Sequence, residues 1–113
     1  MGSTAAIIKI PVIYTSDVVL SVQPVVNRRG ELQYFVHCDV RHWAASVARD
    51  FEQRWQAFRE AFPEPLYALH EPDQANAIKF ARSFGFQEVE RLVTIKGEHF
   101  VLSVHAAILS WQE

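Results

Sequence analysis

The residue types best suited to acid–base chemistry stand near the predicted ends of strands. Candidates for a general base are Glu31, His37, Asp39, His42 and His70. His70 and Glu71 follow the apolar run at 66–69, which is typical of a buried strand, and parallel sheets bind ligands at the carboxyl ends of their strands. A histidine beside a carboxylate can exchange protons near neutral pH, which makes His70 and Glu71 the candidate catalytic residues. The alternative, which we favour, is a strand-end His70 that is hydrogen-bonded to backbone.

The five histidines do not form a pattern that predicts a metal site. No pair has the spacing H-x-x-H or H-x-x-x-H, and in a strand Cys38 would face away from its neighbour His37. A metal ion needs several ligands that converge on one point. We therefore expect no metal, and the single cysteine rules out a disulfide within the chain.

Length and composition predict one domain that spans residues 1–113. Half of the 113 residues are hydrophobic, which suffices for a packed core. The net charge is −2 and no basic stripe occurs, so we expect no nucleic-acid partner. No apolar run is long enough to span a membrane, and the first six residues lack the pattern of a signal peptide. We expect a soluble protein of the cytoplasm.

The candidate residues are positioned by a predicted α/β fold with a mixed sheet and the order β-β-β-α-β-α-β-β. Alternation predicts strands at 7–14, 17–26 and 31–40, before a long helix at 42–62 that Pro63 ends. The strand at 66–69 leads into a second helix, which Gly85 closes. Two strands after Phe86 form a hairpin around a turn at 96–98. The strand–helix–strand succession from 31 to 71 predicts a parallel pair with a right-handed crossover.

Periodicity also predicts which faces are buried. The long helix carries an apolar stripe, and we expect Arg59 on the polar side opposite it. The stripe consists of Ala44, Val47, Ala48, Phe51, Trp55, Phe58 and Phe62. The strand at 31–40 has one apolar face, and Phe35 interrupts the polar face, so we expect that second face to be covered too. We expect Trp111 to anchor the end of the chain.

Residues 63–86 carry a motif in addition to this periodicity. Gln74, Ala77, Phe80, Ala81, Gly85 and Phe86 occupy positions of the pattern N-x-x-A-x-x-F-Y-x-x-x-G-F. The segment resembles the second half of the GNAT acetyltransferase fold, in which a strand and a helix carry this pattern. The resemblance implies a GNAT-like mixed sheet that lacks the first strand and the two early helices of the full fold.

The same resemblance implies where acetyl-CoA would bind. GNAT enzymes hold its pyrophosphate on a [QR]-x-x-G-x-[GA] loop at the start of the long helix, where residues 41–46 stand in this chain. The implied cofactor-binding residues are Arg41, Trp43, Ala44, Ser46, Leu69 and Gln74.

Several of these positions depart from the family. Ala44 and Ser46 carry side chains where a phosphate needs close approach to the backbone, and Trp43 adds bulk. Ala81 stands where many members have a tyrosine that protonates the departing thiolate, and a methyl group donates no proton. The alternative for this stretch is an ordinary helix start that Asp39 or His42 caps. We therefore expect no cofactor, with acetyl-CoA as the alternative.

Aromatic residues are numerous for a chain of this length. Eight Phe, three Tyr and three Trp exceed what so small a core can bury, which predicts a protein partner or a homo-oligomer. The alternative is that these rings fill the sheet face that the missing helices leave.

A second resemblance suggests a setting for this function. Asp39, Val40 and Trp43, together with the run at 77–86, resemble small acetyltransferase-like and internal virion proteins of tailed bacteriophages. We expect a non-catalytic GNAT-like module in virion assembly or protein binding, located in the virion or the host cytoplasm. The alternatives are a small N-acetyltransferase that uses acetyl-CoA, with His70 or Glu71 as base, and an effector that binds a host protein.

Overall fold

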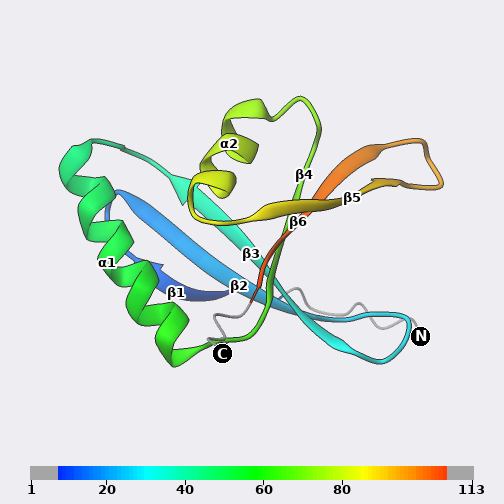
Figure 1. The fold of residues 1–113 in the computed structure, drawn as a ribbon, viewed down its shortest axis with the longest axis horizontal. Helices are drawn as coiled ribbons and strands as arrows, with labels where there is room; N and C mark the ends of the chain where they lie inside the picture. The colour runs from blue at the N-terminus through cyan, green and yellow to red at the C-terminus, as the bar shows by residue number, and fades with distance from the viewer. Residues whose placement is uncertain (1–7, 107–113) are drawn as a thin grey trace, which may run out of the picture.

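A six-stranded mixed sheet with two helices makes up residues 8–106, the part of the chain that the computed structural model describes (Figure 1). The strands are β1 Ile10–Tyr14, β2 Val18–Val26, β3 Leu32–Val40, β4 Leu66–His70, β5 Gln87–Val93 and β6 His99–His105. The helices are α1 Ala45–Ala61 and α2 Ala75–Ser83. The predicted class and element order are thus confirmed, whereas the first residue of the first predicted strand and Trp111 lie outside the described residues.

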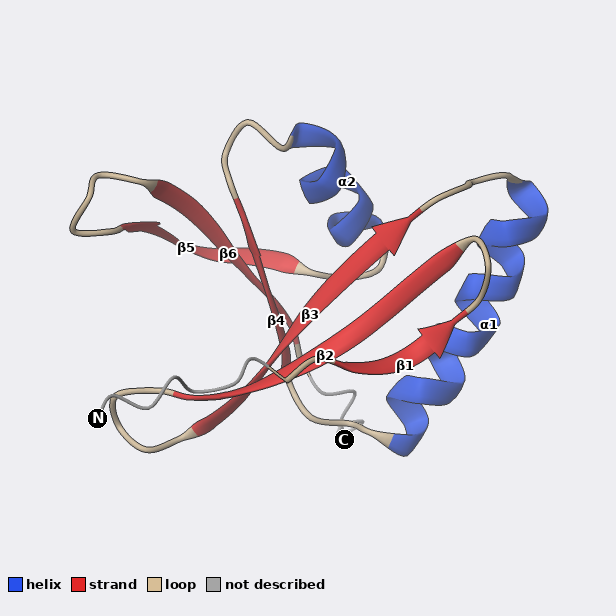
Figure 2. Ribbon diagram, turned by 180° about the vertical axis from the view of Figure 1, so that it is seen from behind, coloured by secondary structure: helices blue, strands red, loops and turns tan. Residues whose placement is uncertain are grey.

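The strands lie side by side in the order β1-β2-β3-β4-β6-β5. All neighbours are antiparallel except β3 and β4, which α1 joins and which run parallel, as predicted. The β2–β3 and β5–β6 hairpins extend away from the helices as two separate arms (Figures 1 and 2). The radius of gyration is accordingly 15.1 Å, whereas a compact domain of this length has about 13 Å.

Both helices pack on the same face of the sheet, here called the helix face. Leu20 of β2 and Leu66 of β4 point to this face and are buried, because alternate residues of a strand share one side. They form one cluster with Phe51 and Trp55 of α1, and Phe84 of α2 packs against it. From β2, β3 and β4, only residues of the helix face belong to this cluster. The core therefore lies between the sheet and the two helices.

Gly85 ends α2 in the way the sequence predicts. Its φ is +97°, in the left-handed region that glycine adopts without strain. The backbone N–H of Gly85 donates to the oxygen of Arg82, and that of Phe86 donates to the oxygen of Ala81, which together make a Schellman motif. A Cβ at position 85 would also lie 3.0 Å from the His105 ring. Gly85 thus turns the chain from α2 directly into β5.

Arg59 corrects the prediction for the polar side of α1. Only 1 % of its surface is exposed. Its guanidinium donates hydrogen bonds to the backbone oxygens of Phe62 at 2.9 Å, Glu64 at 2.7 Å and Ala106 at 3.1 Å. It also lies 5.8 Å from the centre of the Trp55 ring, within cation–π range. Arg59 is buried because it links the end of α1 to the turn before β4 and to the end of β6.

Replacing Arg59 with methionine should lower the free energy of unfolding by about 3 kcal/mol, because three carbonyl oxygens would lose a charged donor. Urea denaturation followed by tryptophan fluorescence measures this change. Arg54→Met on the same helix is the matched control, since Arg54 makes only an exposed ion pair with Asp50 at 2.8 Å, worth about 0.5 kcal/mol. Equal losses in the two variants would contradict the role of Arg59.

Candidate functional site

The parallel strands β3 and β4 separate soon after they meet. Only two positions pair, Tyr34 with Leu66 and Phe35 with Tyr67. On their outer sides both strands are fully paired, β3 with β2 along its whole length and β4 with β6 from Leu66 to His70. Residues 36–40 and 68–70 therefore face each other across a gap. Such a gap at the carboxyl ends of parallel strands is where open sheets bind ligands.

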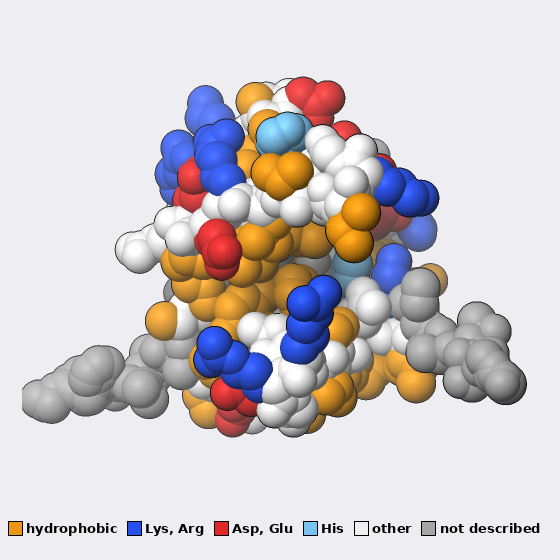
Figure 3. All heavy atoms as spheres, turned by 90° about the vertical axis from the view of Figure 1, so that its right-hand side faces the viewer, with side chains coloured by type: hydrophobic (Ala, Val, Ile, Leu, Met, Phe, Trp, Pro, Cys, Tyr) orange, Lys and Arg blue, Asp and Glu red, His pale blue; other side chains and the backbone are white. Residues whose placement is uncertain are grey.

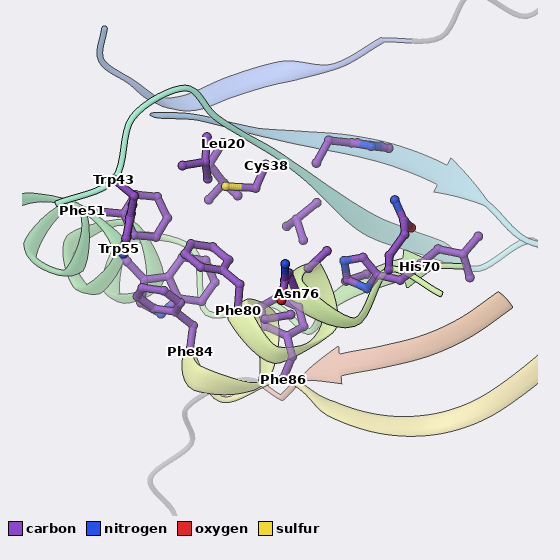
Figure 4. A pocket seen from close by; sticks show the side chains of 18 residues that line it. Leu20, Cys38, Trp43, Phe51, Trp55, His70, Asn76, Phe80, Phe84 and Phe86 are labelled. Carbon is purple, nitrogen blue, oxygen red and sulfur yellow. The ribbon is translucent and has the colours of Figure 1, made fainter. Parts of the chain in front are cut away.

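A pocket of about 550 Å³ opens on the helix face of this gap (Figure 4). Its volume lies in the range of small-ligand sites. Six of its lining residues are aromatic and come from the two helices and their flanking residues: Trp43, Phe51, Trp55, Phe80, Phe84 and Phe86. The rings of Trp43 and Phe80 meet edge to face with their centres 5.1 Å apart, which brings α1 and α2 together above the gap.

The polar groups of the pocket are uncharged. They belong to His37, Cys38, His70, Gln74 and Asn76, and none of the 18 lining residues is Asp, Glu, Lys or Arg. The Nδ1 atom of His70 is buried without a hydrogen-bond partner, and burial lowers the pKa of His70, so its ring is neutral at pH 7. An uncharged wall of this kind favours an uncharged ligand, because a buried charge without a partner is strongly destabilised.

The thiol of Cys38 is also uncharged near neutral pH. Cys38 as a whole residue is exposed, but the atoms around its sulfur exclude water from the thiol. This burial raises the thiol pKa to about 11, and the negative charge of Asp39 is the second cause. Both causes raise the pKa, because each of them disfavours a negative charge on the sulfur.

The structure brings only half of the predicted site residues to this pocket. Trp43, Leu69, His70 and Gln74 line it, whereas Arg41, Ala44, Ser46 and Glu71 do not. Glu71 is exposed and lies on a separate depression with Asp73 and Glu98. His70 and Glu71 therefore do not form a pair. Gln74 has a local structural role, because its side-chain oxygen accepts the backbone N–H of Glu71 at 2.8 Å.

The start of α1 carries no side-chain cap. Its N-cap residue is Ala44, so neither Asp39 nor His42 caps the helix as the alternative interpretation held. Asp39 instead pairs with Arg41 at 3.2 Å, with both side chains largely exposed. No side chain caps the first amides of α1, but Arg41, shortly before them, is paired with Asp39, and Trp43 packs beside them on Phe51 and Phe80.

The sequence analysis did not predict that Cys38, Asn76 and the aromatic side chains line one pocket. The signal was present, because Cys38 alternates with Val36 and Tyr34 on the apolar face of its strand. What the pattern does not contain is the separation of β3 from β4, which depends on how the helices pack.

The second face of the sheet, here called the open face, lies bare within residues 8–106. Within β2 to β6 the strand registers place nine apolar side chains on it, of which Leu69 is exposed and the other eight are half-buried. They are Val19, Val25, Phe35, Tyr67, Leu69, Leu92, Phe100, Leu102 and Val104. The rear view shows β1 to β3 with no helix in front of them, and the end view shows hydrophobic side chains between the two hairpins (Figures 2 and 3). Phe35 is half-buried beside Tyr67, and no helix of residues 8–106 lies over it, so the predicted cover is not found in this part of the chain.

Comparison with known proteins gives no identification. No protein-family model matches the chain, and the searches of curated proteins and of solved structures likewise found no match. The GNAT resemblance therefore stays a prediction that the residues at 74–86 carry.

Residues 8–106 contain neither a cluster of metal-ligating side chains nor a helix that could span a membrane. In this part of the chain, no three His, Cys, Asp or Glu side chains gather as a metal ion would require. Neither described helix combines the length and the apolar character of a membrane span.

Proposed function

We propose that this chain is a non-catalytic protein-binding module with a GNAT-like fold, and that it binds a second copy of itself through the open face. The observation that carries the proposal is the row of nine apolar side chains that no described element covers. Exposed apolar patches of this extent mark interaction surfaces. Phe35 and Tyr67, whose ring centres are 5.6 Å apart, stand at the centre of the face.

The size of the open face suits a dimer. Six strands spaced about 4.8 Å apart and about seven residues long at 3.3 Å per residue cover about 650 Å². A standard interface takes about 800 Å² from each partner. Two sheets that pack face to face also bury alternate side chains on both, which fits β4 and β6, where the side chains on the open face are apolar; on β3 only Phe35 is apolar there.

Charges at the two edges of the face favour a second copy. Lys9 directly precedes β1. Its charge is the second cause, after burial, of the lowered pKa of His37 on the open face, so Lys9 lies near that face. Glu90 pairs with Leu102 at the opposite edge. A two-fold axis parallel to the strands would place Lys9 against the partner's Glu90.

Three features support the absence of catalysis. No carboxylate lines the pocket, His70 lies without a carboxylate partner, and Ala81 offers no proton donor. The residues present also fit acetyl-CoA poorly, because no cation lines the pocket and Arg41 is paired with Asp39. The setting implied by the phage resemblance, assembly of a virion, suits a self-associating module and remains a prediction.

The competing function is a small acyltransferase. Two observations favour it, namely the gap between β3 and β4 and the uncapped amides at the start of α1, which could receive an anion. Its weakness is the lack of a group in the pocket that could act as a charged base or as a partner for phosphate.

Charge reversal at the edges of the open face tests the self-association. Lys9→Glu and Glu90→Lys should each raise the dimer dissociation constant about tenfold, because each places like charges together, and the double variant should recover the original value. Light scattering over a range of protein concentrations measures the mass. Lys79→Glu on the exposed side of α2 is the matched control. A monomer at every concentration, or single variants that dimerise as the parent does, would contradict the proposal.

Acetyl-CoA tests the absence of a cofactor. The melting temperature should stay unchanged in millimolar acetyl-CoA, because the pocket holds no cation for its phosphates. A ligand at a hundred times its dissociation constant would stabilise the protein by about 2.7 kcal/mol, which a thermal melt detects readily. A clear rise in the melting temperature would support the acyltransferase instead.

A further inference from the structure

We propose that the gap between β3 and β4 binds an extended, uncharged peptide segment of another protein, with one apolar side chain inserted into the aromatic pocket. The inference concerns a second site, which opens toward the helix side of the sheet and meets the open face only at His37 and Leu69; it does not rest on self-association through that face.

The backbone of the gap matches an extended chain. Beyond Phe35 and Tyr67 the parallel ladder stops, although β3 continues to Val40 and β4 to His70. Alternate residues of both segments thus direct backbone N–H and C=O groups into the gap rather than to a neighbouring strand. A peptide in extended conformation offers the complementary groups at the same spacing, which is the basis of recognition by strand addition.

The pocket beside the gap supplies a place for one side chain. Leu20 and Val36 of the sheet and Phe51, Phe80 and Phe84 of the helices surround it. Phe51 and Phe84 meet edge to face with their centres 5.1 Å apart, so the wall is formed by packed rings and not by mobile chain ends. Burial of a leucine or phenylalanine side chain here would stabilise a complex without rearranging the core.

The lack of charged side chains in the pocket disfavours charged ligands. No Asp, Glu, Lys or Arg lines the pocket, and both His70 and Cys38 are uncharged near neutral pH. A phosphate or a carboxylate would lose its hydration there without gaining an ionic partner. The buried and unpartnered Nδ1 of His70, with the amides of Gln74 and Asn76, instead offers hydrogen bonds suited to a neutral amide.

Cys38 allows a direct test, because it lines the pocket and is the only cysteine of the chain. Each probe is offered as its mixed disulfide with 2-mercaptoethanol; the Cys38 thiolate attacks the probe sulfur, forms a new disulfide with the probe and releases 2-mercaptoethanol as its thiolate. A probe that fits the site is retained against an excess of free 2-mercaptoethanol. At equilibrium the retained fraction depends on how well the probe fits the site and not on the rate of exchange. The raised pKa of Cys38 slows the exchange and therefore only lengthens the incubation. Mass spectrometry of the intact protein counts the captured probe.

The probes are acetyl-Leu-Gly-Cys-amide and acetyl-Cys-Gly-Leu-amide, with matched peptides that carry glutamate for leucine or N-methylglycine for glycine. At least one leucine peptide should be retained about tenfold better than its glutamate match, since a buried charge is disfavoured. The N-methyl match should also be retained less, because it lacks one amide donor. Equal retention of the leucine and glutamate peptides would overturn the pocket, and equal retention of the N-methyl peptide would overturn the strand-like pairing.

Pantetheine, offered as its disulfide, separates this proposal from an acyl-CoA site. Retention of pantetheine above both leucine peptides would overturn the proposal. Ala81→Met, which fills the pocket, should abolish the preference for leucine, whereas Ala57→Met on the exposed side of α1 should keep it. If Ala81→Met does not fold, the comparison of probes on the unmodified chain still decides the question.

Discussion

Only two paired positions, both between β3 and β4, join the two halves of the sheet by backbone pairing. Tyr34 pairs with Leu66 and Phe35 pairs with Tyr67, and no further rung joins these strands. On one side of this joint stand β1, β2 and β3, and on the other β4, β6 and β5. So short a ladder contributes little by itself, because parallel pairing is slightly less stable per residue than antiparallel pairing. The halves must therefore be held by side chains, and the position of the functional site follows from how this is done.

The helices supply those side chains above the joint. Phe51 of α1 meets Phe80 and Phe84 of α2, with ring centres 6.2 and 5.1 Å apart, and Trp43 packs on both Phe51 and Phe80. At the far end of α1, Arg59 adds a second link, because its guanidinium donates hydrogen bonds to three backbone oxygens. This cluster bridges the two halves and occupies the space above the gap, so the strands need not close beneath it. The same aromatic side chains that stabilise the fold line an apolar, uncharged pocket in the gap.

Local pattern was enough to predict much of the fold. Period-two alternation located the strands, the three- and four-residue spacing located α1, and Gly85 marked the end of α2, because each of these signals depends on neighbours in sequence. The failures all depend on tertiary arrangement. The pattern placed Arg59 in solvent, since periodicity does not record the carbonyl oxygens that a later turn presents to it. It expected cover over Phe35, since alternation shows that a face is apolar and not whether anything lies on it. Adjacency in sequence joined His70 to Glu71, although the end of β4 turns the two side chains toward different depressions.

Beyond Phe35 and Tyr67, β3 and β4 stay apart while the aromatic cluster holds the two halves of the sheet together. Amide hydrogen exchange, read residue by residue by NMR, tests this separation most directly. The amides of residues 36–40 that bond to β2 should be protected, whereas the alternate amides that face the gap should exchange as quickly as unbonded ones. Strong protection of every amide from 36 to 40 would mean that the ladder closes in solution, and the account of the site would then be wrong.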